Sequence, residues 1–346
     1  MEYDFNVVTR NGQNAVITLN DIFIDYREMR KYIAEPVCVD VIEKMKKVTG
    51  KKYAVIYGNC QIGKIFNMIV NNLQFRREYL LVVMPRIFDF KNSDVAEIFD
   101  ETDGQIFKII DLFIGQYVKE TNKFHPKLST KNILQKLKDG SKLIQIPNLY
   151  FVGYFPQLKT EQENSSNLEK IFPTEDKYID EIMSNSEMNP DVEKILDTIC
   201  DGNFLSAEEI QAAIDKSMNE YKKREWFCDI KMSDYIEDNF RDQQVCYSPN
   251  HPMAFVVFEL VHRILKFLGI RSDSFLNQGH FFDSENRTYS LIGQDTPIYP
   301  AVKKYLGLQI CLEKYYANDA RWNLYANFRN YMREYILQCW ANKFTR

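Results

Sequence analysis

The residues best suited to chemistry stand in one short stretch, where a predicted buried strand meets a predicted helix. Tyr53–Tyr57 is apolar and aromatic, Gly58 and Asn59 break the strand, and apolar residues recur at helical spacing from Ile65. Cys60 therefore lies at a strand–turn–helix corner, where the first backbone N–H groups of the helix have no internal partner. Such a corner attracts anions and favours the thiolate form of a cysteine.

The same corner carries most of a phosphate-binding loop, which allows a second interpretation of its chemistry. Gly58 to Lys64 follows the spacing G-x-x-x-x-G-K between a strand and a helix. The next residue, Ile65, stands where Ser or Thr would hold magnesium, so the pattern does not favour a magnesium-dependent nucleotide hydrolase. In this interpretation Lys64 binds the anion, and Ile109-Ile110-Asp111 supplies an acidic strand end.

Three further polar side chains are candidates for the same site. His251 lies between Asn250 and Pro252 in a loop that opens an apolar helix, with Pro252 expected in the first helical turn. There His251 either caps the helix or serves as a general base or acid, because histidine titrates near neutral pH. Gln116 and Asn148 each follow a predicted strand, where a side-chain amide can orient a ligand oxygen.

Alternating strands and helices predict the scaffold of this site. The predicted strands are Tyr53–Tyr57, Tyr79–Met84, Ile106–Ile114 and Lys142–Ile146, with helices near 63–74, 93–101 and 130–138 between them. This spacing is typical of an α/β fold with a parallel sheet flanked by helices. Ligands of such sheets bind beyond the carboxyl ends of the strands, where we place Cys60, Asp111 to Gln116, and Asn148.

The flanking regions are predicted to add a hairpin and many helices. The pattern of residues 1–20 predicts a hairpin with its turn at Asn11-Gly12, and that of residues 21–47 is mostly helical with a break near Glu35-Pro36. Beyond residue 174 the chain is helix-rich, with an apolar helix over 253–268 and aromatic-rich helices over 299–344. We therefore expect a large helical C-terminal region.

The composition of the 346 residues restricts the class of protein. Hydrophobic residues make up 45% and the net charge is −4, which is typical of a soluble globular chain and argues against a nucleic-acid binder. No apolar run reaches the roughly 20 residues that span a bilayer. Seven scattered cysteines indicate a reduced, cytoplasmic setting, and the absence of H-x-x-x-H and C-x-x-C patterns predicts no metal site.

Several blocks in a fixed order make the chain resemble the WcbI family of bacterial polysaccharide-biosynthesis acetyltransferases. The sharpest block is V-I-Y-G-N-C-Q at 55–61. The others are D-L-F-I-G-Q at 111–116, I-P-N-L-Y-F-V-G-Y-F-P at 146–156, I-F-P-T-E-D at 171–176 and N-H-P at 250–252. The resemblance covers residues 53 to 270.

The resemblance implies an α/β fold related to SGNH-type hydrolases and, more distantly, to flavodoxin-like sheets. It also implies acyl transfer from a coenzyme A thioester such as acetyl-CoA to a sugar hydroxyl, in the synthesis of a capsular or surface polysaccharide. Cys60 takes the position of the nucleophile and His251 that of its base. Ser248 stands where SGNH enzymes carry an Asp, so the orienting carboxylate is missing or comes from elsewhere.

The surrounding turn, together with Lys64 and the amides at the strand ends, is expected to bind coenzyme A. The residues implied for this site are Gly58, Asn59, Gln61, Lys64, Gln116 and Asn148. The basic residues that could meet the phosphates are Lys51, Lys52, Arg76 and Arg86. The sequence does not choose between these cations.

This interpretation divides the chain into three parts. We expect an N-terminal hairpin and helical extension at 1–50, a WcbI-like α/β domain at 51–270, and an aromatic-rich helical region packed on it at 271–346. The first and last parts are candidates for selecting the acceptor or for oligomerisation. The alternatives are a magnesium-independent sulfotransferase with a P-loop-like site, an SGNH-type esterase, and a non-catalytic accessory protein that binds coenzyme A or a glycan.

Overall fold

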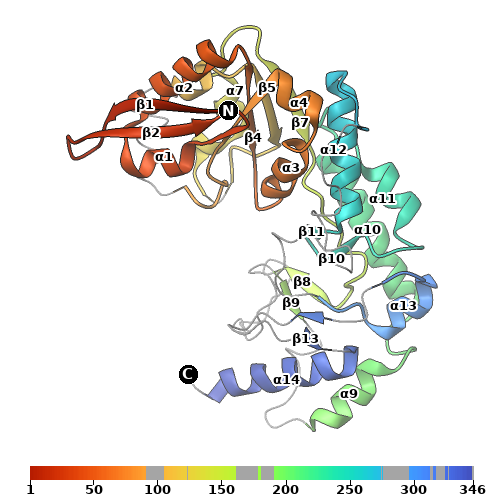
Figure 1. Cartoon of the computed structure of the whole chain (residues 1–346). Helices are drawn as coiled ribbons and strands as arrows, with labels where there is room; N and C mark the ends of the chain where they lie inside the picture. The colour runs from red at the N-terminus through yellow and green to blue at the C-terminus, as the bar shows by residue number, and fades with distance from the viewer. Residues whose placement is uncertain are drawn as a thin grey trace. The chain divides into compact units, whose positions relative to one another are not determined.

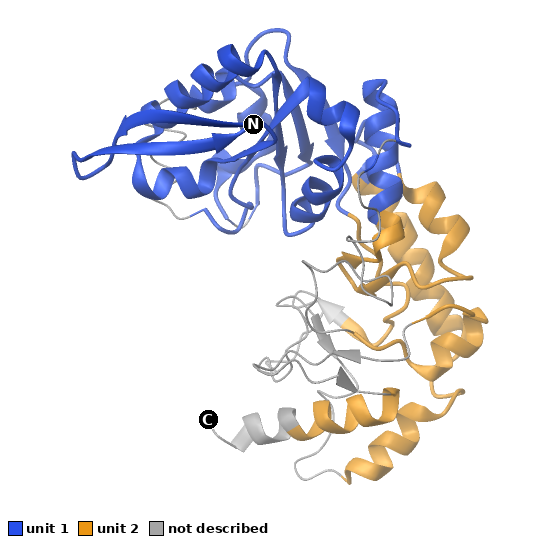
Figure 2. Cartoon of the chain, viewed as in Figure 1, with its two compact units in different colours: residues 1–148, 225–231, 257–281 blue, residues 149–224, 232–256, 282–346 orange. Residues whose placement is uncertain are grey.

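The computed structural model divides into two compact units (Figure 1, Figure 2). It describes residues 1–90, 105–122, 124–160, 178–180, 191–273, 275, 296–311, 315–316, 324–325 and 327–344. Unit 1 comprises residues 1–148, 225–231 and 257–281, and unit 2 comprises residues 149–224, 232–256 and 282–346. The predicted helix near 93–101 and the block at 171–176 lie outside the described residues. The predicted domain limits at residues 50 and 270 stay predictions.

Unit 1 is built on a five-stranded sheet in which each neighbouring pair of strands is parallel. Its elements in chain order are β1 Glu2–Val8, β2 Asn14–Asn20, β3 Phe23–Asp25, α1 Tyr26–Tyr32, α2 Glu35–Thr49, β4 Lys52–Tyr57, α3 Ile62–Ile69, α4 Leu73–Glu78, β5 Tyr79–Val83, α6 Gln105–Lys108, β6 Leu112–Gln116, the 3-10 helix η2 Pro126–Leu128, α7 Thr130–Leu134 and β7 Lys142–Ile146. The strands lie in the order β3-β5-β4-β6-β7. The predicted α/β fold with a parallel sheet flanked by helices is confirmed.

Burial on both faces explains why the central strand β4 is a continuous apolar run. On one face the Tyr53 hydroxyl donates a hydrogen bond to the Ile42 carbonyl of α2, and Tyr53 belongs to the main hydrophobic core. On the opposite face, Phe66 of α3 packs edge-on against Phe23 of β3, with ring centroids 5.3 Å apart. The helices that follow β3 and β4 therefore cover opposite sides of the sheet.

The direction of the strand order reverses at β4. The chain goes from β4 to β5 on one side and then returns to β6 on the other side of β4. In open α/β sheets, ligands bind outside the carboxyl ends of the strands at such a reversal. Gly58 follows β4 directly and Gln116 ends β6, so the predicted corner lies at this point of the sheet.

Two strand predictions need correction. Residues 21–47, expected to be mostly helical, contain the edge strand β3 before α1 and α2. Three residues are too few for a periodic signal. The strand expected at Ile106–Ile114 begins only at Leu112, because Ile106 and Phe107 belong to α6 and bury their side chains in the core. A short buried helix and a buried strand are both continuous apolar runs, so periodicity does not separate them.

Helix boundaries also differ from those expected. The helix predicted over 63–74 divides into α3 and α4, and the Asn72 side chain caps α4 by accepting a hydrogen bond from the Phe75 N–H. Pro36 lies in the first turn of α2 and not in a break before it. Proline is tolerated there because the first residues of a helix make no intrahelical hydrogen bond through their N–H groups, and proline has no N–H. The hairpin expected at residues 1–20 is confirmed as β1 and β2.

Asp111 lies at the amino end of β6 and not at the carboxyl edge of the sheet, where the sequence pattern predicts it. Its carboxylate accepts hydrogen bonds from the Tyr53 N–H at 2.8 Å, from Lys46 Nζ at 2.7 Å and from Lys138 Nζ. Burial by itself would raise the pKa of Asp111, but these hydrogen bonds outweigh burial and lower the pKa below its usual value. Asp111 therefore joins α2, β4 and the segment before β7.

Unit 2 consists mainly of helices and short hairpins. Its elements are β8 Leu158–Thr160, β9 Tyr178–Asp180, α9 Val192–Cys200, α10 Ala207–Glu225, α11 Ser233–Asn239, β10 Cys246–Ser248, β11 His251–Pro252, the first turn of α12 Ala254–Leu268, α13 Pro300–Leu306, β12 Tyr315–Tyr316, β13 Leu324–Tyr325 and α14 Phe328–Phe344. The aromatic stretch 149–156 forms part of its core, where the Tyr154 hydroxyl donates to the Phe240 carbonyl at 2.8 Å. In the described part of the chain, no helix has the length and apolar character needed to cross a membrane.

We predict that Asp111→Asn lowers the free energy of unfolding by about 1–2 kcal/mol at pH 7, because it leaves two lysines without their anion. A carboxyl whose folded-state pKa is depressed stabilises the fold above its unfolded pKa, and this stabilisation is lost as the pH falls through the folded value. The difference from the wild type should therefore shrink below about pH 4. Urea unfolding at pH 7, 5 and 3.5 measures it.

Asp40→Asn is the matched control for this prediction. Asp40 pairs with Lys44 on the exposed face of α2, and such a pair contributes less than about 0.5 kcal/mol. Equal losses for the two variants, or a loss for Asp111→Asn that does not change with pH, would contradict the assigned role of Asp111.

Candidate functional site

The turn between β4 and α3 is built around Gly58. Its φ is 156°, and a Cβ atom at this position would lie 2.3 Å from Gln116 Oε1 and 2.8 Å from Gln116 Cδ. Only glycine leaves room for the Gln116 side chain. The Gly58 carbonyl also accepts a hydrogen bond of 2.9 Å from the Ile87 N–H, which ties the loop after β5 to the same turn.

Three amide side chains hold this turn in one arrangement. Gln116, which is 3% exposed, accepts a hydrogen bond of 2.8 Å from the Asn59 N–H through Oε1 and donates one of 3.0 Å from Nε2 to Gln61 Oε1. The Gln61 N–H in turn donates to Asn59 Oδ1 at 2.9 Å. The backbone N–H groups of Asn59 and Gln61 therefore donate to side-chain oxygens within the turn.

Asn148 joins the network from the end of β7. Its Oδ1 accepts a hydrogen bond of 3.1 Å from Asn59 Nδ2, and both side chains are half-buried. Amides that follow or end β4, β6 and β7 thus meet at the carboxyl edge of the sheet. They supply donors and acceptors without net charge, which suits the orientation of a neutral polar ligand.

Cys60 lies in the middle of this turn, is half-exposed and takes part in no disulfide. Helix α3 begins two residues later at Ile62, so the thiol stands beside the positive end of the helix dipole. Asn59 and Gln61, its chain neighbours, are both fixed by the amide network. The backbone of Cys60 is therefore held from both sides while the residue stays partly exposed.

Arg86 brings a positive charge to the same corner. Its Nε and Nη2 donate to the Asp89 carboxylate at 2.6 and 3.0 Å. These hydrogen bonds raise the pKa of Arg86 above its usual value, and the negative charges of Asp89 and of the Cys60 thiolate add to the effect. Arg86 therefore places a positive charge within electrostatic range of Cys60.

Lys64 does not have the position that a phosphate-binding loop needs. It lies on the first turn of α3 and is only 3% exposed. Asp111, the acidic strand end of that interpretation, is at the opposite edge of the sheet. In a true P-loop the lysine and the acidic residue converge on the phosphates and their metal. The arrangement here does not support the P-loop interpretation.

His251 belongs to unit 2, where it pairs with Ser248 across the short β10–β11 hairpin. Helix α12 begins at Ala254, so Pro252 is part of β11 and not of the first helical turn as expected. His251 Nδ1 lies 2.8 Å from Ser248 Oγ, and the imidazole stacks on the Tyr247 ring. The fully buried Ser248 hydroxyl therefore occupies the position of the expected carboxylate and orients the imidazole.

The structure brings most of the predicted site residues together. Those that gather at the corner are Gly58, Asn59, Cys60, Gln61, Gln116 and Asn148. Lys64 lies in the same unit but is buried. His251 lies in unit 2, and its pairing with Cys60 stays a prediction. Among the described residues, no group of His, Cys, Asp or Glu side chains could hold a metal ion.

Of the candidate cations, Arg86 interacts with the corner, and sequence reasoning missed its partner Asp89. The available signal was the spacing R-x-x-D directly after a strand and a proline. Lys51 precedes β4 and Lys52 is its first residue, so both lie at the opposite edge of the sheet. There Lys51 Nζ donates a hydrogen bond to the Asp21 carbonyl. A parallel sheet separates its two edges by the length of its strands, so these lysines do not reach the corner.

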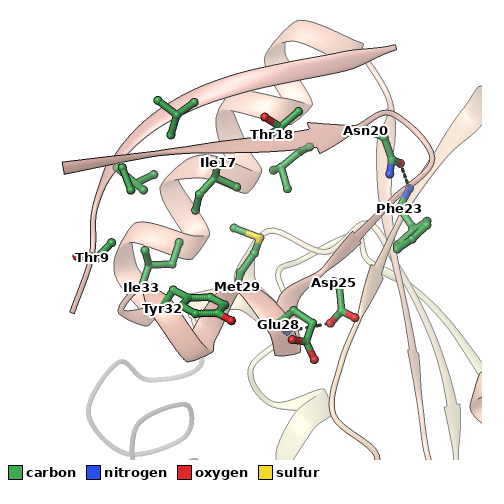
Figure 3. A pocket seen from close by; sticks show the side chains of 14 residues that line it. Thr9, Ile17, Thr18, Asn20, Phe23, Asp25, Glu28, Met29, Tyr32 and Ile33 are labelled. Carbon is green, nitrogen blue, oxygen red and sulfur yellow. Dashed lines mark hydrogen bonds between the residues drawn. The ribbon is translucent and has the colours of Figure 1, made fainter. Parts of the chain in front are cut away.

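A pocket elsewhere in unit 1 contains none of the predicted site residues (Figure 3). It has a volume of about 470 Å³ and lies between the β1–β2 hairpin, β3 and α1. Its walls are mainly apolar, with Ile17 and Met29 among them, and Asp25 and Glu28 lie at one end. Asp25 accepts a hydrogen bond from the Glu28 N–H and so caps α1. The hairpin and α1 are outside the region of the sequence that resembles the family.

We predict that Gly58→Ala destabilises the chain by about 1–3 kcal/mol, because the new methyl group occupies the space of Gln116 Oε1. The destabilisation caused by Gly58→Ala should be smaller in a variant that also carries Gln116→Ala, because the shorter side chain no longer clashes with the new methyl group. Thermal and urea unfolding of the two single variants and the double variant measure this coupling. Additive losses would show that Gly58 and Gln116 do not depend on each other, contrary to the geometry.

Comparison with known proteins places this geometry in a family. The model of the family described as "Polysaccharide biosynthesis enzyme WcbI" matches residues 53–273. A search of curated proteins found no match. The chain is also similar to a solved structure of WcbI, with a TM-score of 0.63 at 20% identity. That structure is described as a novel polysaccharide biosynthesis enzyme, in its native form without a disulfide bond between coenzyme A and a cysteine. The match covers 84% of this chain and 92% of that chain, and shows a shared fold. Since the family model matches more than half of this chain, the chain belongs to the WcbI family of polysaccharide biosynthesis enzymes.

Proposed function

We propose that this chain transfers an acyl group from a coenzyme A thioester to a hydroxyl group of a saccharide. The observation that carries the proposal is the half-exposed Cys60, held by an amide network at a helix N-terminus, in a chain of a polysaccharide biosynthesis family. The description of the similar structure adds support, because it names coenzyme A and a cysteine of that protein together. We take the transferred acyl group to be acetyl.

The corner offers two groups for the donor substrate. Arg86 carries the positive charge that suits the phosphates of coenzyme A, although Asp89 balances part of it. Asn59 Nδ2 bears two hydrogens, of which one is directed to Asn148 Oδ1. The second hydrogen is the donor that we assign to the oxyanion that develops on the thioester carbonyl.

In the proposed reaction His251 accepts a proton and Cys60 attacks. The Cys60 thiol gives its proton to His251, and the thiolate adds to the thioester carbonyl. The carbon–sulfur bond to coenzyme A then breaks, and the departing sulfur takes the proton from His251. The saccharide hydroxyl next attacks the acyl group on Cys60 and gives its proton to His251, from which the leaving Cys60 sulfur recovers it. In the direct alternative, His251 deprotonates the hydroxyl and the oxygen attacks the thioester without an acyl-enzyme.

Ser248 determines which nitrogen of His251 acts as the base. When Nδ1 carries the proton, it donates to Ser248 Oγ and leaves Nε2 to accept the proton of the thiol or hydroxyl. A hydroxyl orients the ring as a carboxylate would, but it carries no negative charge to stabilise the imidazolium. Ser248 is therefore a positioning residue in this proposal.

The identity of the donor substrate is tested by measuring the melting temperature of the protein with each of four ligands. These are coenzyme A, acetyl-CoA, ATP with magnesium, and 3′-phosphoadenosine-5′-phosphosulfate. We predict that only coenzyme A and acetyl-CoA raise the melting temperature, with about 2.7 kcal/mol of stabilisation at a hundredfold excess over the dissociation constant. Cys60→Ala and His251→Ala should each lower acyl transfer to a saccharide by about 10²–10⁴-fold. Release of coenzyme A with and without a saccharide separates the transferase from an esterase.

Cys311→Ala and His262→Ala are the matched controls, because both residues are half-buried and neither has a role in the proposed reaction. Stabilisation by the phosphosulfate or ATP in place of coenzyme A would contradict the proposal in favour of a sulfotransferase or nucleotide enzyme. Binding of coenzyme A with no turnover, and no effect of His251→Ala, would instead identify an accessory protein. Near-full transfer by both Cys60→Ser and Cys60→Ala would disprove the covalent route.

Ser248→Ala should lower kcat by about tenfold and leave KM nearly unchanged, because it removes only the hydrogen bond that orients His251. Ser248→Thr, which keeps the hydroxyl, should recover most of the rate. The pH profile of kcat gives a second readout, since loss of the hydrogen bond changes the apparent pKa of the base. An unchanged profile together with a full rate in Ser248→Ala would remove Ser248 from the mechanism.

A further inference from the structure

Unit 1 exposes a pair of stacked aromatic rings that the proposed reaction does not use. Tyr117 and Phe227 lie with ring centroids 5.1 Å apart and planes 17° from parallel. The side chains are 39% and 57% exposed, and the neighbouring Trp226 is 78% exposed. We call these three residues the aromatic platform. Exposure of several large aromatic side chains in one place is unfavourable in water, so such a patch indicates a binding surface.

The platform stands on a rigid base. The segment 225–231 returns to unit 1 from the middle of the chain and covers the edge strand β7. The N–H groups of Asp229 and Ile230 donate to the Gln145 carbonyl at 2.8 and 3.2 Å, and the Gln145 N–H donates to Asp229 Oδ2 at 2.7 Å. Lys231 Nζ donates to the Trp226 carbonyl at 3.2 Å. The backbone that carries Trp226 and Phe227 is therefore held by hydrogen bonds, so binding a ligand costs little backbone conformational entropy.

The other half of the platform is joined to the candidate site. Tyr117 directly follows Gln116, whose side chain holds the backbone at Asn59 and Gln61, and one peptide unit spans about 3.8 Å between Cα atoms. Thr130 fixes the chain on both sides of Tyr117, because its hydroxyl donates to the Gln116 carbonyl and accepts from the Val118 N–H. Tyr117 thus lies at the carboxyl end of β6, at the edge of the sheet that also carries the amide network.

The chemistry of the platform selects its ligand. The platform residues carry no charge, and the nearby ammonium of Lys231 is directed at the backbone carbonyls of Glu225 and Trp226. A phosphate or another polyanion therefore finds no matching partner on it. Sugar rings suit it better, because their C–H faces are apolar and pack against flat aromatic rings while their hydroxyl groups stay hydrated.

We propose that Tyr117, Trp226 and Phe227 bind the sugar rings of the saccharide acceptor. This inference rests on the proposed transfer to a saccharide and names the residues that would hold it. The rings give contact area and orientation, and Gln116, which directly precedes Tyr117, belongs to the amide network of the corner. The platform then positions one hydroxyl group of the saccharide for acylation.

A glycan array of bacterial surface-polysaccharide fragments, probed with the full chain, tests the platform. We predict that the wild type binds saccharides and that Phe227→Ala and Tyr117→Ala each weaken the binding of the best fragment by about tenfold in calorimetry. Phe227→Tyr and Tyr117→Phe, which keep a ring, should bind as the wild type does. Saccharide binding should also change the fluorescence of Trp226, and the change should be absent in Trp226→Phe.

Phe267→Ala is the matched control, since Phe267 is an exposed aromatic of unit 1 that packs on Lys142 at the other end of β7. The proposal is overturned if no fragment binds the wild type, or if the alanine variants bind as tightly as it does. Loss of self-association in size-exclusion chromatography, with saccharide binding unchanged, would overturn it in favour of a protein partner. The thermal shift by coenzyme A, measured on the same variants, fails only if the proposed function itself is wrong, so the two failures are distinguishable.

Discussion

The corner depends on one steric fact, which is that the Gln116 side chain occupies the place of a Cβ atom at Gly58. This close approach brings β6 and the turn after β4 together, and it allows the Gln116 amide to accept from Asn59 and donate to Gln61. The turn is otherwise a short connection between a strand and a helix, with freedom to adopt several conformations. The amide network removes that freedom, and Cys60 is presented in one position as a result.

The two edges of the sheet carry different electrostatics. At the amino edge, Asp111 is surrounded by lysines and a backbone N–H, and these interactions hold three elements of unit 1 together. At the carboxyl edge, the groups that meet are neutral amides, a thiol and the Arg86–Asp89 pair. A charged network at the amino edge stabilises the fold without facing the ligand. At the carboxyl edge the charges of Arg86 and Asp89 partly balance each other, so this described part of the edge carries little net charge.

The two units contribute different parts of the proposed chemistry. Unit 1 carries the thiol, the amide network and the aromatic platform, whereas unit 2 carries the Ser248–His251 pair. The platform itself shows how the chain connects the units, because residues 225–231 come from between helices of unit 2 and pack on β7.

Local patterns in the sequence were sufficient to predict the α/β class, the strands β4, β5 and β7, and the corner with Cys60 between Gly58 and Gln61. These features depend on side chains that are near one another in the chain, such as a buried apolar run or a glycine after a strand. The sequence also indicated Gln116 and Asn148 as polar residues at strand ends, but not that both reach Asn59. That contact depends on the strand order, in which β6 lies beside β4 although α3, α4 and β5 come between them in the chain. The tertiary structure alone also decided that Asp111 begins its strand, that Lys64 is buried, that Ser248 contacts His251, and that Phe227 stacks on Tyr117. The physical reason is that a strand's direction and register are set by its partners across the sheet, and the sequence of one strand does not contain them.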